Sequence, residues 1–405
     1  MPKAFILTKI KDSILRSPRC RLIFCLILAC PSVSCSPVGE ANFDETIEPN
    51  KIRTVAISDP DQALTFVRIE RYGKKRVIAV RQYRDGIVEG IDLSALLNRE
   101  VDDPIQLFLA EGYDTLSKVI AGAASNCQIK VPLDKLILPV DLKDHHIATG
   151  MNFRKHADET TVEQGPFLFP KLVKPTGPYS PVNAGAALLD YEVEIAWVPL
   201  RPIMKGSTPK YMGLILCNDF TDRETLLRHI EVGNIESGKG FTTGKSFSNY
   251  LPVGNLFVIP RDFRAFVAKI ELRLYVNYAL RQRSMVNEMI WNIDQIIAEI
   301  WARRGAIWQH QDQMVSLFEE AEFISDRVLI MSGTPQGTVF RGVGAGPRIS
   351  GFFTWLLGGW RDSIATHAIE VYIDNAQAAE IYLQPGDQIL IYVDFMGMLH
   401  NNVIR

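Results

Sequence analysis

Cysteine is nearly absent from the body of this chain. Four of the six cysteines fall within the first 35 residues and only two lie beyond them: Cys20, Cys25, Cys30 and Cys35 against Cys127 and Cys217. No pair has the spacing Cys-x-x-Cys, so the sequence offers neither a disulfide framework nor a cysteine zinc site. Cys217 ends an apolar run, Leu214–Cys217, and is expected to be a small buried hydrophobe.

The chain also lacks a strong net charge. Its 44 Lys and Arg against 46 Asp and Glu give −2, although residues 1–35 hold six basic residues and one acid, so that the rest sums to −7. A mildly acidic body lacks the positive surface that binds a phosphate backbone, and we expect no nucleic-acid partner. The 47% hydrophobic content excludes intrinsic disorder, and 405 residues allow two to three domains.

The apolar run of the basic N-terminal stretch is too short to span a bilayer. It covers nine residues, Leu22–Cys30, where a spanning helix needs about 18 or more. A basic segment, a short apolar one and then small residues are typical of an export signal. Cleavage near Ala29 or Ser34 would leave Cys30 or Cys35 first, as in a bacterial lipoprotein. We expect residues 1–35 to be a signal peptide or lipoprotein-like leader of an exported, periplasmic protein, which is membrane-anchored only if lipidated; a leader without a targeting role would leave the protein cytoplasmic.

Two regions follow the leader. Residues 40–136 form a small β-rich module, with expected strands at Lys51–Ile57, Thr65–Arg71 and Arg76–Gln82 and short helices at Asp103–Glu111 and Thr115–Ala124. Residues 137–405 read as strands separated by Pro/Gly turns, among them Val328–Met331 and Gln388–Val393, with one amphipathic helix over 287–303. The apolar stretch Gly351–Trp360 is expected to pack in a core or interface; a lid over a site or an interfacial anchor are the alternatives.

Three carboxylates stand out by position. Strand alternation puts Glu192 and Glu194 on one face, and Asp219 follows the apolar strand Tyr211–Cys217. If the two strands are neighbours, the three form an all-oxygen set suited to Mg²⁺, Mn²⁺ or Ca²⁺. A solvated Glu-x-Glu face is the alternative.

Further polar groups occur in short motifs. His156 and Glu159 share a face of a helical turn, where the carboxylate could orient the imidazole as a general base, although a surface pair would look the same. Two Gly-bracketed loops, 244–247 with Lys245 and 332–337 with Thr334, could bind an anion or be plain turns. Neither is a P-loop, because the spacing Gly-x-x-x-x-Gly-Lys-Ser/Thr is absent.

The order of these motifs resembles the fumarylacetoacetate hydrolase family, in particular its acylpyruvate hydrolase-like branch. The resemblance spans about 137–405 and is carried by six motifs: His156-x-x-Glu159, Tyr191-Glu192-Val193-Glu194, Asn218-Asp219-Phe220-Thr221-Asp222-Arg223-Glu224, Gly244-Lys245-Ser246-Phe247, Ser332-Gly333-Thr334-Pro335-Gln336-Gly337 and Leu383-Gln384-Pro385-Gly386-Asp387. The ending Gly397-Met398-Leu399-His400-Asn401 is also similar to the family's.

The resemblance implies an α+β, mainly β fold, a mixed β-sandwich roll that usually forms a homodimer. It implies a divalent ion, Mg²⁺ or alternatively Mn²⁺ or Ca²⁺, held by Glu192, Glu194 and Asp219. His156 with Glu159 would activate water, while the groups expected to bind a small anionic 2-oxo or β-diketo acid are Lys245, Thr334, Arg223 and Gln282. Such an ion would stabilise the enolate that C–C bond cleavage produces.

The chain departs from the family pattern at several positions. Ser248 and Glu224 stand where the family has Asp, and Arg283 and Val286 replace its Asp and Thr near Arg281-Gln282. Inserts are expected at about 224–241 and 338–382. We therefore expect a metal-dependent hydrolase that cleaves a C–C bond in an acylpyruvate or related β-diketo acid. The alternatives are an oxaloacetate-like decarboxylase, an isomerase or hydratase on the same metal site, and a non-catalytic exported binding protein.

Overall fold

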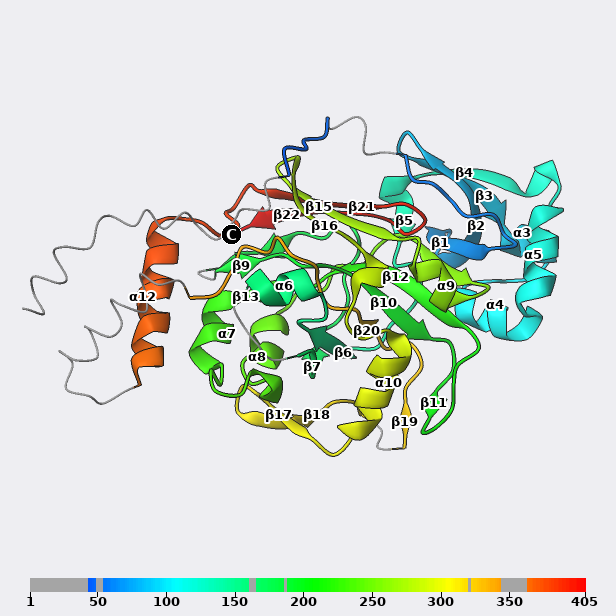
Figure 1. Cartoon of the computed structure of the whole chain (residues 1–405). Helices are drawn as coiled ribbons and strands as arrows, with labels where there is room; N and C mark the ends of the chain where they lie inside the picture. The colour runs from blue at the N-terminus through cyan, green and yellow to red at the C-terminus, as the bar shows by residue number, and fades with distance from the viewer. Residues whose placement is uncertain (1–42, 49–53, 160–164, 186–187, 320–321, 344–362) are drawn as a thin grey trace, which may run out of the picture. The chain divides into compact units, whose positions relative to one another are not determined.

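The computed structural model describes residues 43–48, 54–159, 165–185, 188–319, 322–343 and 363–405. Residues 41–405 form one compact unit. The expected leader and the apolar stretch Gly351–Trp360 lie outside the described residues. Figure 1 shows the arrangement of the strands and helices within the compact unit.

The fold is α+β and mainly β, as the sequence predicts, and an eleven-stranded sheet is its centre. The strand order is β4-β3-β2-β1-β14-β12-β10-β20-β6-β7, with β5 paired to β1. The members are β1 (Ala63–Arg71), β2 (Lys74–Arg84), β3 (Ile87–Asp92), β4 (Gln128–Pro132), β5 (Leu136–Ile137), β6 (His145–Gly150), β7 (Phe167–Leu172), β10 (Val193–Pro199), β12 (Met212–Asn218), β14 (Phe257–Pro260) and β20 (Ile330–Met331).

This sheet runs through both sequence regions. β1 pairs antiparallel with β14, Phe66 opposite Phe257, so the strands of the N-terminal module continue into those of the larger region. The expected boundary at 136/137 separates two regions of the sequence, but hydrogen bonds join their strands in one sheet.

A second sheet of five strands has the order β16-β15-β21-β22-β8. Its members are β8 (Val182–Asn183), β15 (Glu271–Val276), β16 (Ala279–Met285), β21 (Gln388–Val393) and β22 (Gly397–Ile404). The described residues also form three two-stranded pairs: β9 (Leu189–Asp190) with β13 (Thr221–Asp222), β11 (Ile203–Met204) with β19 (Phe323–Ile324), and β17 (Ile307–His310) with β18 (Gln313–Ser316).

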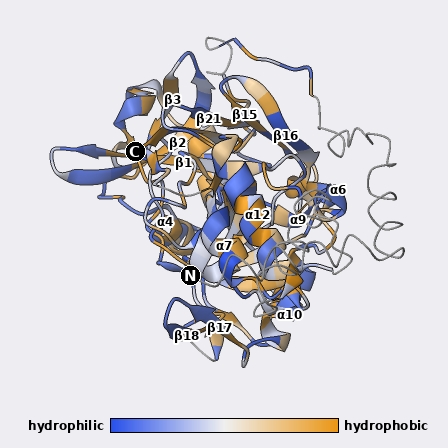
Figure 2. Cartoon of the chain, turned by 90° about the vertical axis from the view of Figure 1, so that its left-hand side faces the viewer, coloured by the Kyte–Doolittle hydropathy of each residue, from blue (hydrophilic) through white to orange (hydrophobic). Residues whose placement is uncertain are grey.

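The helices are short and mostly lie on the sheets. They are α3 (Leu93–Leu97), α4 (Pro104–Glu111), α5 (Tyr113–Ala121), α6 (Arg154–Glu159), α7 (Arg223–His229), α8 (Phe241–Lys245), α9 (Phe263–Val267), α10 (Ile293–Ala302) and α12 (Ile364–Ala378). Figure 2, the view from the α12 side, shows hydrophilic and hydrophobic residues alternating along this helix. Among the described helices, none has the length and apolar composition needed to cross a bilayer.

Several expected boundaries differ in the structure. The helix expected over 287–303 begins at Ile293, because Asn292 and Gln295 form a capping box that fixes the start. The strand expected at Val328–Met331 shortens to β20. In Lys51–Ile57, the described part contributes only an isolated bridge between Val55 and Tyr83. Strong local hydrogen bonds at caps and pairing with neighbouring strands decide these ends, and hydrophobic pattern alone does not encode them.

His146 lies fully buried in β6, between two β-neighbours of the central sheet. Its Nδ1 accepts a hydrogen bond from the Leu329 backbone N–H at 3.0 Å. Burial, together with the charge of Lys171 and with His145, lowers the pKa of His146 to about 3 from 6.5. The folded protein therefore keeps this imidazole neutral in mildly acidic solution.

We predict that His146 makes stability fall in mild acid. Between about pH 7.5 and about pH 5.5 the unfolded chain gains a proton at this residue and the folded chain does not, which costs about 1.4 kcal/mol of unfolding free energy. Urea unfolding of His146→Gln should lose that much less than the parent over the same interval. His229→Gln, which removes an exposed histidine, is the control; parallel losses in parent and His146→Gln would contradict the prediction.

Candidate active site

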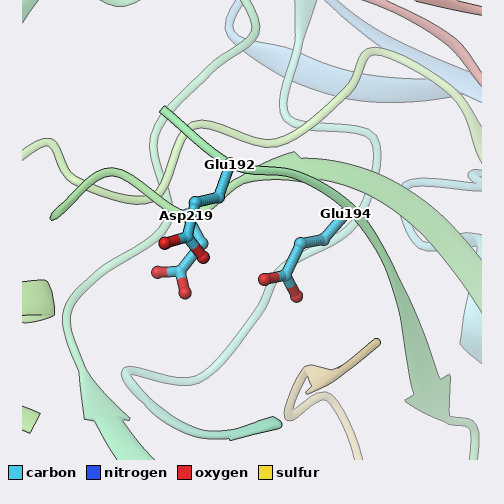
Figure 3. A group of neighbouring side chains, drawn as sticks. All are labelled: Glu192, Glu194 and Asp219. Atoms are coloured by element: carbon cyan, nitrogen blue, oxygen red, sulfur yellow. The ribbon is translucent and has the colours of Figure 1, made fainter. Parts of the chain in front are cut away.

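Three acidic side chains meet where β10 and β12 lie side by side. Val193 at the start of β10 is opposite Asn218 at the end of β12, so Glu192, Glu194 and Asp219 come to one place. Carboxylate oxygens of the three lie within 4.8 Å of one another, and the residues are only 6%, 1% and 1% exposed. Figure 3 shows the three carboxylates gathered together. The alternative of a solvated Glu-x-Glu face does not fit these exposures.

Two lysines contact the acidic cluster. The Lys245 Nζ lies 2.8 Å from Asp219 Oδ2 and 2.9 Å from Glu192 Oε2, and it donates to Thr221 Oγ1 at 2.7 Å. The Lys171 Nζ donates to Asp219 Oδ1 and to the Lys245 carbonyl. Each carboxylate oxygen of Asp219 therefore has its own ammonium donor.

Lys171 is a site residue that sequence reasoning missed. It lies in β7, in the run Phe167-Leu168-Phe169-Pro170-Lys171, and is fully buried. A lysine inside an apolar strand is a signal by itself, since such a charge is kept in a protein interior only when it is paired. The partner, Asp219, lies 48 residues further along the chain, and this pairing is invisible to local patterns.

Arg223, the first residue of α7, also contacts the acidic cluster. Its Nε donates to Asp190 Oδ2 at 2.8 Å, and one terminal nitrogen donates to Glu192 Oε1 at 2.6 Å. Asp190 also accepts from the backbone N–H groups of Val339 and Phe340 at 2.9 and 3.1 Å. Because Asp190 is fully buried, these donors are its compensation for lost water.

The charges of this site do not cancel. Four buried carboxylates, Asp190 with the three of the triad, face three cations. Burial and the neighbouring Asp219 and Glu192 raise the pKa of Glu194 well above its usual value. Burial acts in the same direction on Glu192, but Lys245 and Arg223 outweigh it and its pKa is lowered. Within the part of the chain that the structure describes, Glu192 and Asp219 each pair with cations and Glu194 does not, and a bound positive ion would supply the missing charge.

The His156/Glu159 pair lies in α6, as the motif predicts. Glu159 Oε2 is 3.8 Å from His156 Nδ1 and accepts the Gly337 N–H at 3.0 Å. Gly337 has φ +99°, and a Cβ there would lie 1.9 Å from the Arg281 carbonyl oxygen, so only glycine fits. Asn152 fixes the entry to α6, since its side chain bonds to the Trp291 backbone and to the Ser332 carbonyl.

The 332–337 loop is hydrogen-bonded to β10, the strand that carries Glu194. The Gly333 N–H donates to Glu194 Oε2 at 2.9 Å. Thr334 and Gln282 are both buried, and they hydrogen-bond to each other and to the Val193 backbone. Gln282 donates to Thr334 Oγ1 at 2.9 Å and accepts the Val193 N–H at 2.9 Å. Thr334 donates to the Val193 carbonyl at 3.1 Å. In this arrangement they hold the loop on β10 beside the triad.

Lys245 comes from a helix and not from a loop. It is the last residue of α8, and Ser246 Oγ accepts the Leu172 N–H at 2.9 Å, which ties this turn to β7. A Cβ on Gly244 would lie 2.8 Å from Leu226 Cβ and 3.0 Å from the Asp222 carbonyl. The glycine of the motif therefore serves the close packing of α8 on α7, which aims Lys245 at the acidic cluster.

The fold is mainly β, and its buried carboxylate triad, two lysines and His/Glu pair are the kinds of groups found in the active sites of metal-dependent enzymes. Residues 145–404 match the family model described as fumarylacetoacetate (FAA) hydrolase C-terminal, well over half of the chain. The chain belongs to the fumarylacetoacetate hydrolase family, whose members are mostly metal-dependent hydrolases and isomerases.

The relatives include proteins of several activities. A mitochondrial oxaloacetate tautomerase of Oryza sativa subsp. japonica is 29% identical over 206 residues, 47% of this chain and 79% of that protein. Fumarylacetoacetate hydrolase from Exiguobacterium antarcticum superposes with a TM-score of 0.52 at 20% identity, over 84% of this chain and 99% of the other. Maleylpyruvate hydrolase from Sphingobium sp. SYK-6, in complex with manganese(II) and pyruvate, gives 0.51 at 19%, with the same coverage. At such identities the two structures support the fold.

We predict that Lys171→Met destabilises the protein by about 3 kcal/mol, because it removes one of the two ammonium donors of the buried Asp219 carboxylate. Lys245 still contacts Asp219, which places the cost at the low end of the usual range. Chemical unfolding in the presence of a chelator measures it. Lys174→Met changes an exposed lysine three positions away and is the matched control; equal midpoints for the two variants would refute the prediction.

Proposed function

We propose that this protein is a divalent-metal-dependent hydrolase that cleaves a C–C bond in an acylpyruvate or related β-diketo acid. The observation that carries the proposal is the buried triad of Glu192, Glu194 and Asp219, with His156 near enough to Glu192 to help lower the pKa of that carboxylate, after Lys245 and Arg223. Membership of the family and the preserved order of its motifs support the same chemistry.

The triad fits a divalent cation such as Mg²⁺, Mn²⁺ or Ca²⁺. Its donors are all oxygen, and three ligand atoms lie within 4.8 Å of one another. Burial, and after it the neighbouring Asp219 and Glu192, raises the pKa of Glu194, and a bound cation would stabilise its ionised form. When bound there, the ion supplies Lewis-acid stabilisation of the charge that develops on a substrate oxygen.

In this proposal His156 is the general base. It takes a proton from water, whose oxygen adds to the distal carbonyl carbon of the substrate. The C–C bond then breaks, and its electron pair passes to the pyruvate half as an enolate. Protonation of the enolate carbon gives pyruvate, and the acyl half leaves as a carboxylic acid. Glu159, held by the Gly337 N–H, keeps the imidazole oriented and stabilises its charged form.

Lys245 is assigned to the anionic end of the substrate. Its ammonium group bridges Glu192 and Asp219. Burial lowers the pKa of Lys245, but the two carboxylates outweigh burial, so the pKa is raised and the ammonium stays charged. Arg223 on Glu192 assists from the other side, and Thr334 and Gln282 hold the loop that presents the backbone next to Glu194. A divalent cation added to these four carboxylates and three cationic side chains would give the site a net charge of about +1, which favours small anions.

A second candidate is tautomerisation of an oxaloacetate-like acid, which the similarity to the Oryza sativa tautomerase favours. Both reactions pass through an enolate, and they differ in whether water adds to a carbonyl. Decarboxylation belongs to the same group, since it also needs no attacking water.

The surroundings of the enzyme are part of the proposal. Residues 1–35 would direct export to the periplasm, with membrane anchoring only through a lipid on Cys30 or Cys35, and the chain would act as a homodimer on small anionic acids. An exported protein that kept the fold only for binding is the opposing view.

Turnover of acetylpyruvate by the purified protein should require Mg²⁺ or Mn²⁺. Glu192→Ala should lower kcat/KM by about 10³-fold or more, because it removes a carboxylate ligand and uncovers Lys245. Absorbance loss of the β-diketone measures the rate. Glu236→Ala, an exposed residue of the 224–241 insert, is the control. If the purified parent binds no divalent ion and Glu192→Ala behaves like the parent, the non-catalytic view is favoured.

His156→Ala separates hydrolysis from the alternatives. Loss of a general base should reduce acetylpyruvate hydrolysis by about 10²–10⁴-fold, whereas decarboxylation of oxaloacetate, which needs no attacking water, should persist. Both activities are assayed on the same metal-loaded preparations. Unchanged hydrolysis in the variant would remove His156 from the proposed role.

A further inference from the structure

Helix α12 packs on α7, the helix that begins with Arg223. α12 lies beside α7 in both views, and it contributes to a second hydrophobic cluster made of Leu188, Leu226, Leu227, Ile369, Ile373, Ala376 and Tyr382. Two polar contacts fasten its outer side to α7: Arg228 to Glu370 at 2.5 Å and Gln377 to Glu224 at 2.7 Å. Phe340 and Tyr372 pack against this cluster and are half-buried.

These two aromatic rings continue toward the arginine of the site. The Phe340 ring centroid is 5.5 Å from Arg223 Cζ, so the ring face covers the guanidinium. The Tyr372 ring meets Phe340 edge to face, with centroids 5.7 Å apart and planes at 88°. The Tyr372 and Tyr382 hydroxyls share a hydrogen bond at 2.6 Å, and Leu383 next to it donates to the Leu189 carbonyl at 3.1 Å.

The contacts form one chain from α12 to the triad. Tyr372 supports Phe340, Phe340 covers Arg223, and Arg223 holds Glu192 Oε1 at 2.6 Å. Arg223 is only 4% exposed, so water cannot orient it and the ring and Asp190 must. With Oε1 fixed in this way, Glu192 keeps Oε2 directed to the side where Lys245 and Asp219 lie.

We propose that Phe340 and Tyr372 are positioning residues for a divalent ion at the triad. They hold the Arg223 guanidinium in place, and through it they restrict the rotamers of Glu192 before the ion binds. Part of the segment at 338–382 thereby supports the metal-binding carboxylates from behind. The inference rests on the proposed function, because it needs a divalent ion to bind between Glu192, Glu194 and Asp219.

The test is Mn²⁺ affinity of the full chain, followed by electron paramagnetic resonance of the free ion. Residues in direct contact with metal ligands typically change affinity by about 10–100-fold, and for a ring one contact further out we expect Phe340→Leu to weaken Mn²⁺ binding by about 3–10-fold. Phe340→Tyr keeps the ring face and should restore affinity to within about twofold of the parent. The spectrum of bound Mn²⁺ should broaden in Phe340→Leu, since Glu192 becomes less ordered.

Phe108→Leu is the matched control. Phe108 lies in α4, far from α12 in Figure 1, and makes similar edge-to-face contacts with Tyr113 and Tyr211. Tyr372→Leu, a half-buried position that folding tolerates better, should weaken binding in the same direction. The inference is overturned if the parent binds Mn²⁺ and both variants bind it as tightly as Phe108→Leu does. A parent that binds no Mn²⁺ overturns the proposed function, and this inference with it.

Discussion

The compensation of buried negative charge is the constraint on which the site depends. Asp190, Glu192, Glu194 and Asp219 are all removed from water, and ionised carboxylates are tolerated there only when cations and hydrogen-bond donors replace the solvent. Lys171, Lys245 and Arg223 provide most of this, and the backbone N–H groups of 333, 339 and 340 provide more. The remainder is a preformed attraction for a positive ion.

The fold can be understood as the device that brings these cations together. Each comes from a different element: Lys171 from β7, Arg223 from α7 and Lys245 from α8. The sheet order places β10 and β12 side by side, while α8 contacts β7 and α7. Glycines at 244, 333 and 337 permit backbone approaches that a side chain would block. Motifs far apart in the sequence therefore act as one group.

Sequence reasoning found the elements whose signals are local. The Glu-x-Glu spacing, the His-x-x-Glu turn and the strand ending at Asp219 predicted which side chains would meet, and Gln388–Val393 is a strand with the expected bounds. It missed Lys171, whose partner is remote. It also placed the start of α10 too early, because the N-cap at Asn292, and not the apolar period, fixes where the helix begins. The packing of Phe340 on Arg223 had no sequence signal, since such contacts arise only when distant segments fold together.

The continuous sheet also has a consequence for the solubility of the larger region. If the N-terminal strands were lost or exchanged, Phe257–Pro260 of β14 would lose its antiparallel partner and show bare N–H and C=O groups to other chains, the kind of edge that promotes aggregation. Strand β1 of the small module thus covers an edge of the sheet that carries the acidic triad. Any other N-terminal module would have to supply a strand that pairs with β14 in the same register, Ala63 to Phe66 opposite Pro260 to Phe257.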